Sequence, residues 1–358
     1  MLFLRLRYVP ALGIGVGVAA LLSAIGPLDG DVKAAPKAAA DAAREVCLAS
    51  LYVRPPAPTQ DVTGEPLHRD RAGYWNGVPD RVLLDRIQKQ PIRSITFNLG
   101  GSSLSLRLQL ADGSSAAFKP EQIHPQTVPR KEIAAYRLNR MLGLSRVPPA
   151  TWRVLRLKEL YTHMAPRHRH LFFRIRKEAK FRKGWKLAGE VSWWIPRIKY
   201  IPVDRWKNRK RWYQWLKAYK RLPRHHAEVT RQLSVMMIFD FLINNPDRFS
   251  GFNTMGTPDE KFLYFMDNTY SFHPSARGGR RARSGLHRTM RYSRRFYARL
   301  KALTLPRLRA AMRTAPGAPF TLLSEPEMRA VIDRRNYAVQ YINRVIARYG
   351  WQKTMVFR

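Results

Sequence analysis

Two aspartates, each placed after an apolar segment, constrain this chain more than any other feature. Asp247 and Asn253 follow one apolar segment closely, and Asp267 ends a second apolar run at 262–266. In phosphoryl transfer, one aspartate orients or deprotonates the attacking hydroxyl, while an asparagine and a second aspartate hold a divalent metal ion against the phosphate oxygens of a nucleotide. The pattern therefore predicts a nucleotide-dependent phosphotransferase.

The N-terminal residues are organised differently from the rest. Arg5 and Arg7 precede an uncharged apolar run that ends at Pro27, which is typical of a signal peptide or of a short membrane anchor over 1–27. Either one sends the rest of the chain to the non-cytoplasmic side of a membrane, into a periplasm, a secretory lumen or the extracellular space. Residues 28–85 are expected to form a flexible spacer.

Strand patterns occupy the next part of the chain. The runs 92–97, 104–110 and 116–119 are separated by turn signals at 100–103 and 112–114. This spacing predicts an antiparallel meander.

The first of these turns and the last of these strands carry candidate nucleotide contacts. A turn containing Gly100, Gly101 and Ser102 lets backbone amides approach a triphosphate, and the third strand can place Lys119 beneath it as a charge partner. Taken singly, a glycine pair is most often an ordinary turn, and a lysine is most often a solvated surface residue. Their order along the chain favours nucleotide binding.

A helix with an apolar face follows the strands. Apolar residues recur at helical spacing from Ile133 to Leu142, and Gly143 ends the pattern. Glu132 lies in the first turn, where the helix dipole favours a carboxylate even without a functional role. The alternative is that Glu132 is the acidic partner of Lys119 or of a metal ion.

Four segments, in the same order, resemble successive motifs of the secretory-pathway kinases, the group that includes the Golgi casein kinase, the glycosaminoglycan xylose kinase and the four-jointed kinases. The segments are Ala117-Phe118-Lys119-Pro120, residues 132–149, residues 239–248 and Met266-Asp267-Asn268. The match spans roughly residues 90–300. It implies a divergent two-lobed kinase fold that uses ATP or a related nucleotide together with Mn²⁺ or Mg²⁺.

Carried over residue by residue, the resemblance assigns a role to each matching side chain. It makes Lys119 the phosphate-binding lysine, Asp247 the catalytic aspartate and Asp267 a metal ligand. Glu132 becomes the helix glutamate of the cofactor site, which in this family contacts metal. Arg248 follows the catalytic aspartate as in the family, and it joins the cofactor site with Gly100, Gly101 and Ser102.

The chain departs from the family pattern at several places. After the Asp-Arg pair the Golgi enzymes continue with His-His-Tyr-Glu, whereas this chain has residues 249–253 ending in Asn253. Asn253 is assigned to the second metal ion, because amide oxygens are suitable hard ligands. Asp-Asn-Gly becomes Asp267-Asn268-Thr269, and the family's disulfides cannot form because Cys47 is the only cysteine.

The aspartates also have structural interpretations. Asp240 follows a hydrophobic helix pattern and is expected to be buried and hydrogen-bonded to backbone. Asp247 beside Arg248 also fits an exposed ion pair in a turn, and Asp267 also fits the cap of a turn after a strand.

Lysine and arginine are interleaved with aromatic residues throughout 156–232, where acids are few. Residues 189–195 are typical of a strand and lie where a kinase chain crosses between lobes, so their backbone is expected to bind adenine. The composition also suits single-stranded nucleic acid or a membrane interface. Because no nucleic-acid-binding motif is present, a solvated basic insertion packed on the C-terminal lobe is favoured.

Helical signals fill the remainder of the chain. Residues 276–301 are arginine-rich with near-helical apolar spacing, and Ser324 opens a capping-box helix that ends at Gly350. The expected fold class is α+β, an atypical two-lobed protein-kinase-like fold. A small β-rich N-lobe is predicted at 86–155, a basic aromatic insertion with the hinge at 156–232, and a larger α-helical C-lobe with the catalytic motifs at 233–358.

The predicted function is a metal-dependent kinase that transfers the γ-phosphoryl group of ATP to a hydroxyl. The net charge of +40 favours an acidic protein or an anionic glycan as the acceptor, and it also suits an anionic membrane surface. Two alternatives stay open: a catalytically inactive pseudokinase or polyanion-binding module, and a kinase-fold transferase that moves another nucleotide-derived group. The sequence leaves the oligomeric state open.

Overall fold

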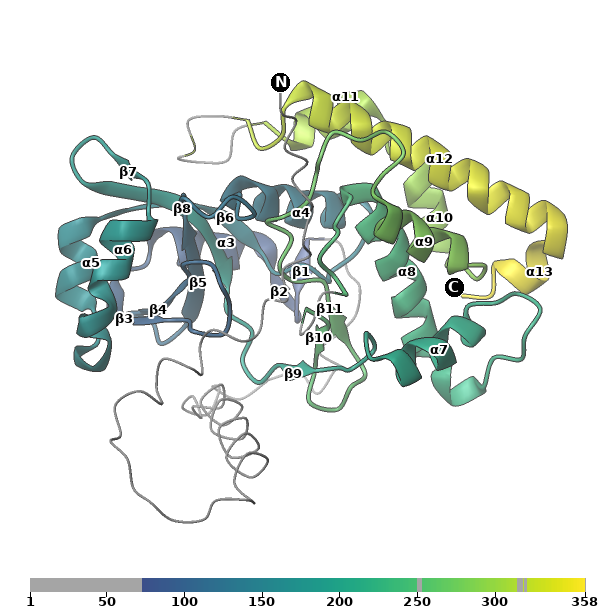
Figure 1. Cartoon of the computed structure of the whole chain (residues 1–358), viewed down its shortest axis with the longest axis horizontal. Coiled ribbons are helices and arrows are strands. Elements are labelled where there is room, and N and C mark those ends of the chain that lie inside the picture. The colour runs from purple at the N-terminus through teal and green to yellow at the C-terminus, as the bar shows by residue number, and fades with distance from the viewer. Residues whose placement is uncertain (1–72, 250–252, 314–317, 319–320, 358) are drawn as a thin grey trace, which may run out of the picture. The chain divides into compact units, whose positions relative to one another are not determined.

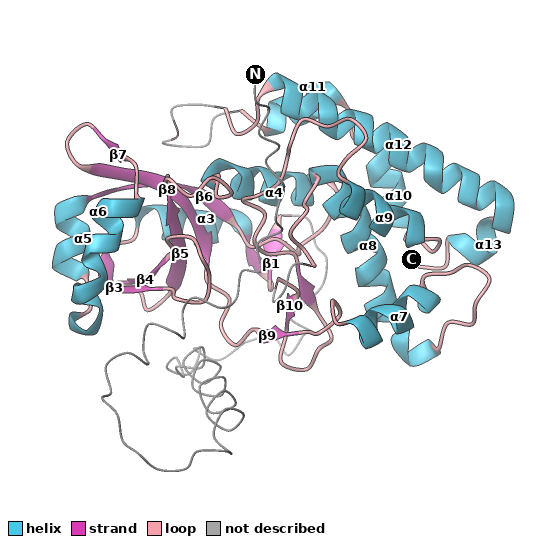
Figure 2. Ribbon diagram, in the orientation of Figure 1, coloured by secondary structure: helices cyan, strands magenta, loops and turns pink. Residues whose placement is uncertain are grey.

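The structure, a computed structural model, describes residues 73–249, 253–313, 318 and 321–357. The strands are β1 (Tyr74–Trp75), β2 (Val78–Pro79), β3 (Ile92–Phe97), β4 (Leu106–Leu110), β5 (Ser115–Pro120), β6 (Ala150–Arg156), β7 (Phe181–Arg182), β8 (Lys186–Trp193), β9 (Lys199–Tyr200), β10 (Met255–Gly256) and β11 (Leu263–Tyr264). The helices are α3 (Asp80–Lys89), α4 (Pro129–Met141), α5 (Leu157–His163), α6 (Phe172–Glu178), α7 (Trp206–Trp215), α8 (Ala227–Ile243), α9 (Arg280–Arg288), α10 (Arg294–Lys301), α11 (Leu305–Ala311), α12 (Glu325–Tyr349) and α13 (Trp351–Thr354), with 3-10 turns η1 (Pro166–Leu171) and η2 (Arg224–His226). Strands dominate the N-terminal part and helices the C-terminal part (Figure 2), which confirms the predicted α+β class.

A six-stranded antiparallel sheet forms the N-terminal lobe. Its strands run in the order β3-β4-β5-β8-β6, and β7 pairs with β8. The predicted runs at 92–97, 104–110 and 116–119 correspond to β3, β4 and β5. β3 pairs with β4 and β4 with β5, both antiparallel, which confirms the predicted meander. In β4, the side chains of Leu106, Leu108 and Leu110 are buried and alternate with less buried ones, so one face of the sheet lies against the core.

Strand β8 lies in the middle of the sheet, although α4, β6 and α5–α6 separate it from β5 in the chain. It falls inside the segment 156–232 that the sequence assigned to an insertion, so the sheet extends beyond the predicted boundary at residue 155. Hydrogen bonding to β5 on one side and β6 on the other fixes β8 there. Two parts of the predicted insertion, the end of α5 and η1, pack against β3 in the N-terminal lobe. Between them, the Ala165 amide donates a hydrogen bond to the Ile95 carbonyl at 2.9 Å.

The N-terminal lobe also begins earlier than expected. β1 and β2 form a hairpin and α3 follows, so residues 74–85 of the predicted spacer belong to the fold. The buried carboxylate of Asp80 at the start of α3 accepts hydrogen bonds from the Tyr136 hydroxyl at 3.0 Å and from Arg140 Nε at 2.5 Å, both on α4. Leu83 is buried on the same helix, and these contacts hold α3 against the lobe.

The predicted signal peptide or anchor at 1–27, and the spacer up to residue 72, lie outside the described residues. Among the helices that the structure describes, none is both long enough and apolar enough to cross a bilayer.

Helix α4 lies between the sheet and the helical lobe (Figure 1). Pro129 occupies its first turn, and Gly143 follows its end with φ +72°, a left-handed conformation that glycine adopts at little cost. Both ends agree with the predicted helix. Ile133, Ala134 and Leu138 are buried completely, so α4 contributes to the core on more than one side.

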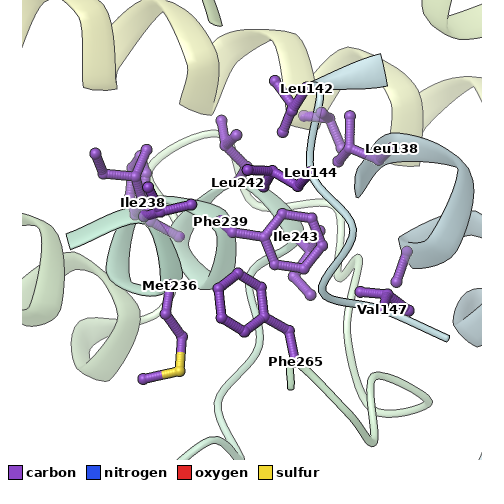
Figure 3. Close-up of a cluster of buried hydrophobic side chains, with 14 of the residues drawn as sticks. Leu138, Leu142, Leu144, Val147, Met236, Ile238, Phe239, Leu242, Ile243 and Phe265 are labelled. Atoms are coloured by element: carbon purple, nitrogen blue, oxygen red, sulfur yellow. The ribbon is translucent and has the colours of Figure 1, made fainter. Parts of the chain in front are cut away.

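The helical lobe is built around α8, which is buried from Leu233 to Ile243 because its sequence is apolar on nearly every side. Figure 3 shows Phe239 and Ile243 beside Phe265, with Leu138 and Val147 reaching the same cluster from the α4 region. The core is therefore continuous from α4 into the helical lobe.

The last long helix, α12, confirms the predicted capping box. The Ser324 hydroxyl accepts a hydrogen bond from the Glu327 amide, and the Glu327 carboxylate accepts one from the Ser324 amide at 2.8 Å. The helix ends at Gly350, whose φ is +81°. It packs against α8, α10 and α11 and completes the lobe.

Candidate active site

Lys119 and Asp267 meet between the sheet and the segment that follows β11. Lys119 Nζ lies 2.8 Å from Asp267 Oδ1. Burial alone would lower the pKa of Lys119, but the carboxylates of Asp267, Glu132 and Glu190 outweigh burial and raise it. The ammonium group in turn lowers the pKa of Asp267, so both groups are held in their charged forms.

Glu132 on α4 is hydrogen-bonded by Asn268, and it acts on Lys119 through its charge without a hydrogen bond among the described residues. One carboxylate oxygen accepts the Asn268 amide at 2.5 Å, and the other accepts Asn268 Nδ2 at 2.9 Å. Burial raises the pKa of Glu132. The sequence predicted an acidic partner for Lys119 or for metal, and that role stays a prediction; in the structure this carboxylate also fixes α4 to the segment that carries Asp267.

Asp247 and Asn253 are joined by hydrogen bonds. Asn253 Nδ2 donates to the Asp247 carbonyl and to its Oδ2, both at 3.0 Å, and the Asp247 amide donates to Asn245 Oδ1 at 2.8 Å. Asn244, which caps α8 in the left-handed conformation, turns the chain into this loop. Hydrogen bonds to Asn245 and Asn253 therefore fix the backbone and the side chain of Asp247.

Arg248 has a different task from the predicted cofactor contact. Its side chain is buried, with Nε and Nη2 donating to the Asp240 carboxylate at 3.1–3.2 Å. Nη1 donates to the carbonyls of Asn253 and Met266, and Nη2 also donates to Asn268 Oδ1 at 2.8 Å. A guanidinium has five N–H groups, and these protein acceptors use all of them, so Arg248 clamps the loops together. Asp240 is buried as expected, but among the described residues its carboxylate is hydrogen-bonded by the Arg248 side chain and not by the backbone.

One asparagine of the site, Asn245, was not predicted from the sequence. Asn245 Nδ2 lies 3.4 Å from the Asp267 carbonyl and 3.3 Å from Asn268 Oδ1. Because Asn245 also holds the Asp247 amide, it joins the two aspartate segments directly. The only signal in the sequence is the pair Asn244-Asn245 directly after an apolar helix, which is also typical of a simple helix end.

Glu190 was missed as well, and it lies next to Lys119 in the sheet. The two residues are partners in the register of β5 and β8. Glu190 is 1% exposed, and its Oε1 has no hydrogen-bond partner among the described residues. Burial, and then the nearby carboxylate of Glu132, raise the pKa of Glu190 to about 8. The available signal was an acid within a predicted strand of a segment in which acids are few.

The predicted phosphate turn stays a prediction. Gly100, Gly101 and Ser102 lie in the exposed connection between β3 and β4. Among the described residues, no hydrogen bond joins this turn to Lys119 or Asp267.

The oxygen donors around Asp267 fit a hard divalent cation. Asp267 Oδ1 accepts from Lys119 and Thr269, while Oδ2 has no hydrogen-bond partner in the described part of the chain. Asn253 binds Asp247 through its Nδ2, so its Oδ1 points to the other side of the amide. Carboxylate and amide oxygens are the ligands that Mg²⁺ and Mn²⁺ prefer. Within residues 73–357, as far as they are described, no group of three or more His, Cys, Asp or Glu side chains has metal-site geometry.

Curated relatives of this chain carry the names of kinases. No family model matches it. It is 24% identical over 321 residues to the extracellular serine/threonine protein kinase FAM20C of Homo sapiens, covering 75% of this chain and 54% of that protein. It is also 24% identical over 335 residues to the glycosaminoglycan xylosylkinase of Danio rerio, covering 80% of each. The chain therefore spans about half the length of the human relative.

Solved structures of the Golgi casein kinase and of hydra Fam20 share the fold of this chain. The Golgi casein kinase with Mn and ADP bound matches with a TM-score of 0.62 and 17% identity, over 77% of this chain and 78% of that one. Hydra Fam20 with sugar matches with a TM-score of 0.58 and 18% identity, over 76% and 90%. These matches confirm the two-lobed kinase-like fold, and the curated relatives confirm the resemblance to the secretory-pathway kinases.

Arg248→Met is expected to lower the free energy of unfolding by about 3–5 kcal/mol, because it leaves the buried Asp240 carboxylate without its partner. Urea denaturation at pH 7 measures the change. Asp85→Asn, which breaks an exposed pair with Lys89 on α3, is the control and should cost less than about 1 kcal/mol. If the two variants lose similar amounts, Arg248 is not the clamp described here.

Glu190→Gln is expected to flatten the dependence of stability on pH. The pKa of Glu190 is raised from 4.5 to about 8, so the folded state binds a proton that the unfolded state releases between these values. The wild-type protein should therefore lose up to about 1.4 kcal/mol of stability per pH unit as pH rises through this window, and the variant should lose less. Urea denaturation at pH 5, 6.5 and 8 tests this, with the exposed Glu228→Gln as control. An unchanged slope for Glu190→Gln would contradict the assignment.

Proposed function

We propose that this protein is a metal-dependent kinase that transfers the γ-phosphoryl group of ATP to an acceptor hydroxyl. The observation that carries the proposal is one hydrogen-bonded network that joins Lys119, Asp267, Asn245 and Asp247. Phosphoryl transfer depends mostly on positioning and charge stabilisation, and these are the groups that it requires. The names of both curated relatives are consistent with this reaction class.

Four side chains of the site have a task in this reaction. Asp247 accepts the proton of the acceptor hydroxyl as its oxygen forms a bond to the γ-phosphorus and the bond to ADP breaks. Lys119 contributes positive charge to the phosphate oxygens. Asp267 and Asn253 are the residues that would hold Mn²⁺ or Mg²⁺, which supplies further positive charge to the phosphates when bound.

Lys119 is paired with Asp267, so a nucleotide phosphate and Asp267 compete for the same ammonium group. Lys119 is only 17% exposed, whereas Asp267 is 44% exposed and approachable from solvent. A phosphate group that draws Lys119 away frees Asp267 Oδ1, which then becomes available to the metal ion. Nucleotide and metal are therefore expected to bind cooperatively.

The acceptor is proposed to be acidic, because a basic helix is attached to the catalytic loop. Phe249, two residues after Asp247, stacks on Trp212 of α7 with the ring planes 28° apart. Trp212 is itself buried and donates to the Val203 carbonyl at 2.7 Å. The same helix presents Lys207 and Lys210 to solvent without acidic partners in the described structure. A positive field beside the loop concentrates anionic acceptors such as acidic protein segments or anionic glycans.

Export of the chain remains part of the proposal. It rests on the charged and apolar pattern of residues 1–27, and the name of the human relative is consistent with an extracellular location.

Asp267→Asn is expected to lower kcat by about 100-fold or more, because it removes charge that stabilises the transferring group, while the fold survives. Lys119→Ala should mainly weaken nucleotide binding, by about tenfold or more. The assay incubates the protein with labelled ATP and Mn²⁺ or Mg²⁺ and weighs the product by mass spectrometry, which separates phosphoryl transfer from transfer of AMP. Asp333→Asn, on the exposed side of α12, is the control. Transfer at the wild-type rate by Asp267→Asn would exclude the proposed site.

Lys207→Gln/Lys210→Gln is expected to lower kcat/KM for acidic acceptors and to leave the KM for nucleotide unchanged. The loss should shrink as salt is added, because screening over about 8 Å at physiological ionic strength removes the same attraction. Lys177→Gln/Lys183→Gln, the same charge change near α6, is the matched control. Equal effects of the two variants, or equal use of basic acceptors, would show that α7 does not select the acceptor.

A further inference from the structure

A compact cluster of aromatic rings and cations joins the segment after α7 to the end of the chain. The rings of Tyr219 and Tyr349 lie 5.8 Å apart. Lys217 and Lys220 place their ammonium groups 5.8 and 6.0 Å from the Tyr219 ring, and the Arg348 guanidinium lies 5.4 Å from the Tyr349 ring. We refer to this cluster, together with Trp351, Lys353 and Val356, as the aromatic–cationic surface.

Large apolar groups of this surface face solvent. Tyr219 is 54% exposed, Trp351 47% and Val356 40%. Isolated exposed apolar residues are ordinary, but these lie on two neighbouring segments whose charged side chains are all cations. Figure 1 shows the loop after α7 and α13 at the same end of the helical lobe, where the chain terminates.

The surface carries charge of one sign. No Asp or Glu occurs in residues 205–227 or 334–358. In the described structure, Lys217, Lys220 and Lys353 have no acidic partner. Lysines that are not paired with carboxylates project an uncompensated positive field, which attracts an extended anionic surface.

Buried contacts fix the surface in place before anything binds. Arg291 donates to the carbonyls of Trp215 and Lys220, and the Met290 amide donates to the Leu216 carbonyl at 3.0 Å. The loop that carries Tyr219 is thus held against the helical lobe, so little conformational entropy is lost when it docks.

We propose that the aromatic–cationic surface docks this protein on an anionic bilayer, with Trp351 and Tyr219 at headgroup depth and the surrounding cations on the lipid phosphates. Tryptophan and tyrosine favour the membrane interface because one part of each ring system is apolar and another is polar. Cations beside them gain from the negative surface potential of the membrane. Cations alone are enough to bind a soluble polyanion. The exposed aromatic rings and Val356 gain only from a partner with an apolar region, such as the boundary between lipid headgroups and acyl chains. This inference does not rest on the proposed function.

Tryptophan fluorescence tests the proposal in the full chain. Residues 1–72 contain no tryptophan, so quenching by brominated lipid does not report the apolar run at 9–27. With vesicles of phosphatidylcholine and phosphatidylserine, quenching of the wild-type protein should exceed that with phosphatidylcholine alone. Trp351→Phe should remove most of this quenching. Trp185→Phe, which replaces a 61% exposed tryptophan at the other end of the fold, should retain it.

Charge variants supply a second, independent measurement. Lys217→Gln/Lys220→Gln should lower the apparent partition coefficient obtained from the quenching titration about 30-fold, since each cation near an anionic membrane contributes about fivefold. Lys183→Gln/Lys186→Gln should leave it within about twofold of the wild type. The proposal is overturned if Trp351→Phe is quenched like the wild type, if neutral vesicles quench equally, or if Trp351 responds to a soluble polyanion but not to vesicles.

Discussion

Arg248 donates its five N–H groups to acceptors on the end of α8, the Asn253 loop and the segment around Asp267. A planar guanidinium sets the directions of all these hydrogen bonds at once, so the segments cannot shift independently. Glu132 continues the same network to α4 by holding Asn268. Because these contacts are buried, they act in a medium that screens charge weakly. The positions of Asp247 and Asp267 relative to each other follow from this clamp.

The large excess of cations is accommodated in two ways. Some arginines are buried and use backbone carbonyls in place of carboxylates: Arg334 is fully buried and donates to the carbonyls of Leu242, His273 and Ser275. Each of these contacts also gives a hydrogen-bond donor to a buried carbonyl that would otherwise lack one. Other cations stay at the surface, where we propose that their field attracts acidic acceptors beside α7 and lipid phosphates beside α13.

The elements predicted from the sequence were those whose signal is local. Strands β3 to β5, helix α4 with Gly143, and helix α12 with its Ser324 capping box are each specified by residues within one element. The position of β8 and the inclusion of α3 in the lobe were missed. Both depend on partners far away in the chain: β5 and β6 pair with β8, and Arg140 binds Asp80.

The sequence by itself determined the fold class and selected Lys119, Asp247, Asn253 and Asp267 as candidate site residues, because the order of the motifs along the chain can be read without knowing the fold. Only the tertiary structure decided how these residues are connected. It hydrogen-bonded Glu132 to Asn268, engaged the donors of Arg248 with protein acceptors, and set Glu190 beside Lys119. Hydrogen bonds and burial depend on distance in space, and residues separated by more than a hundred positions in the chain come together only in the folded core.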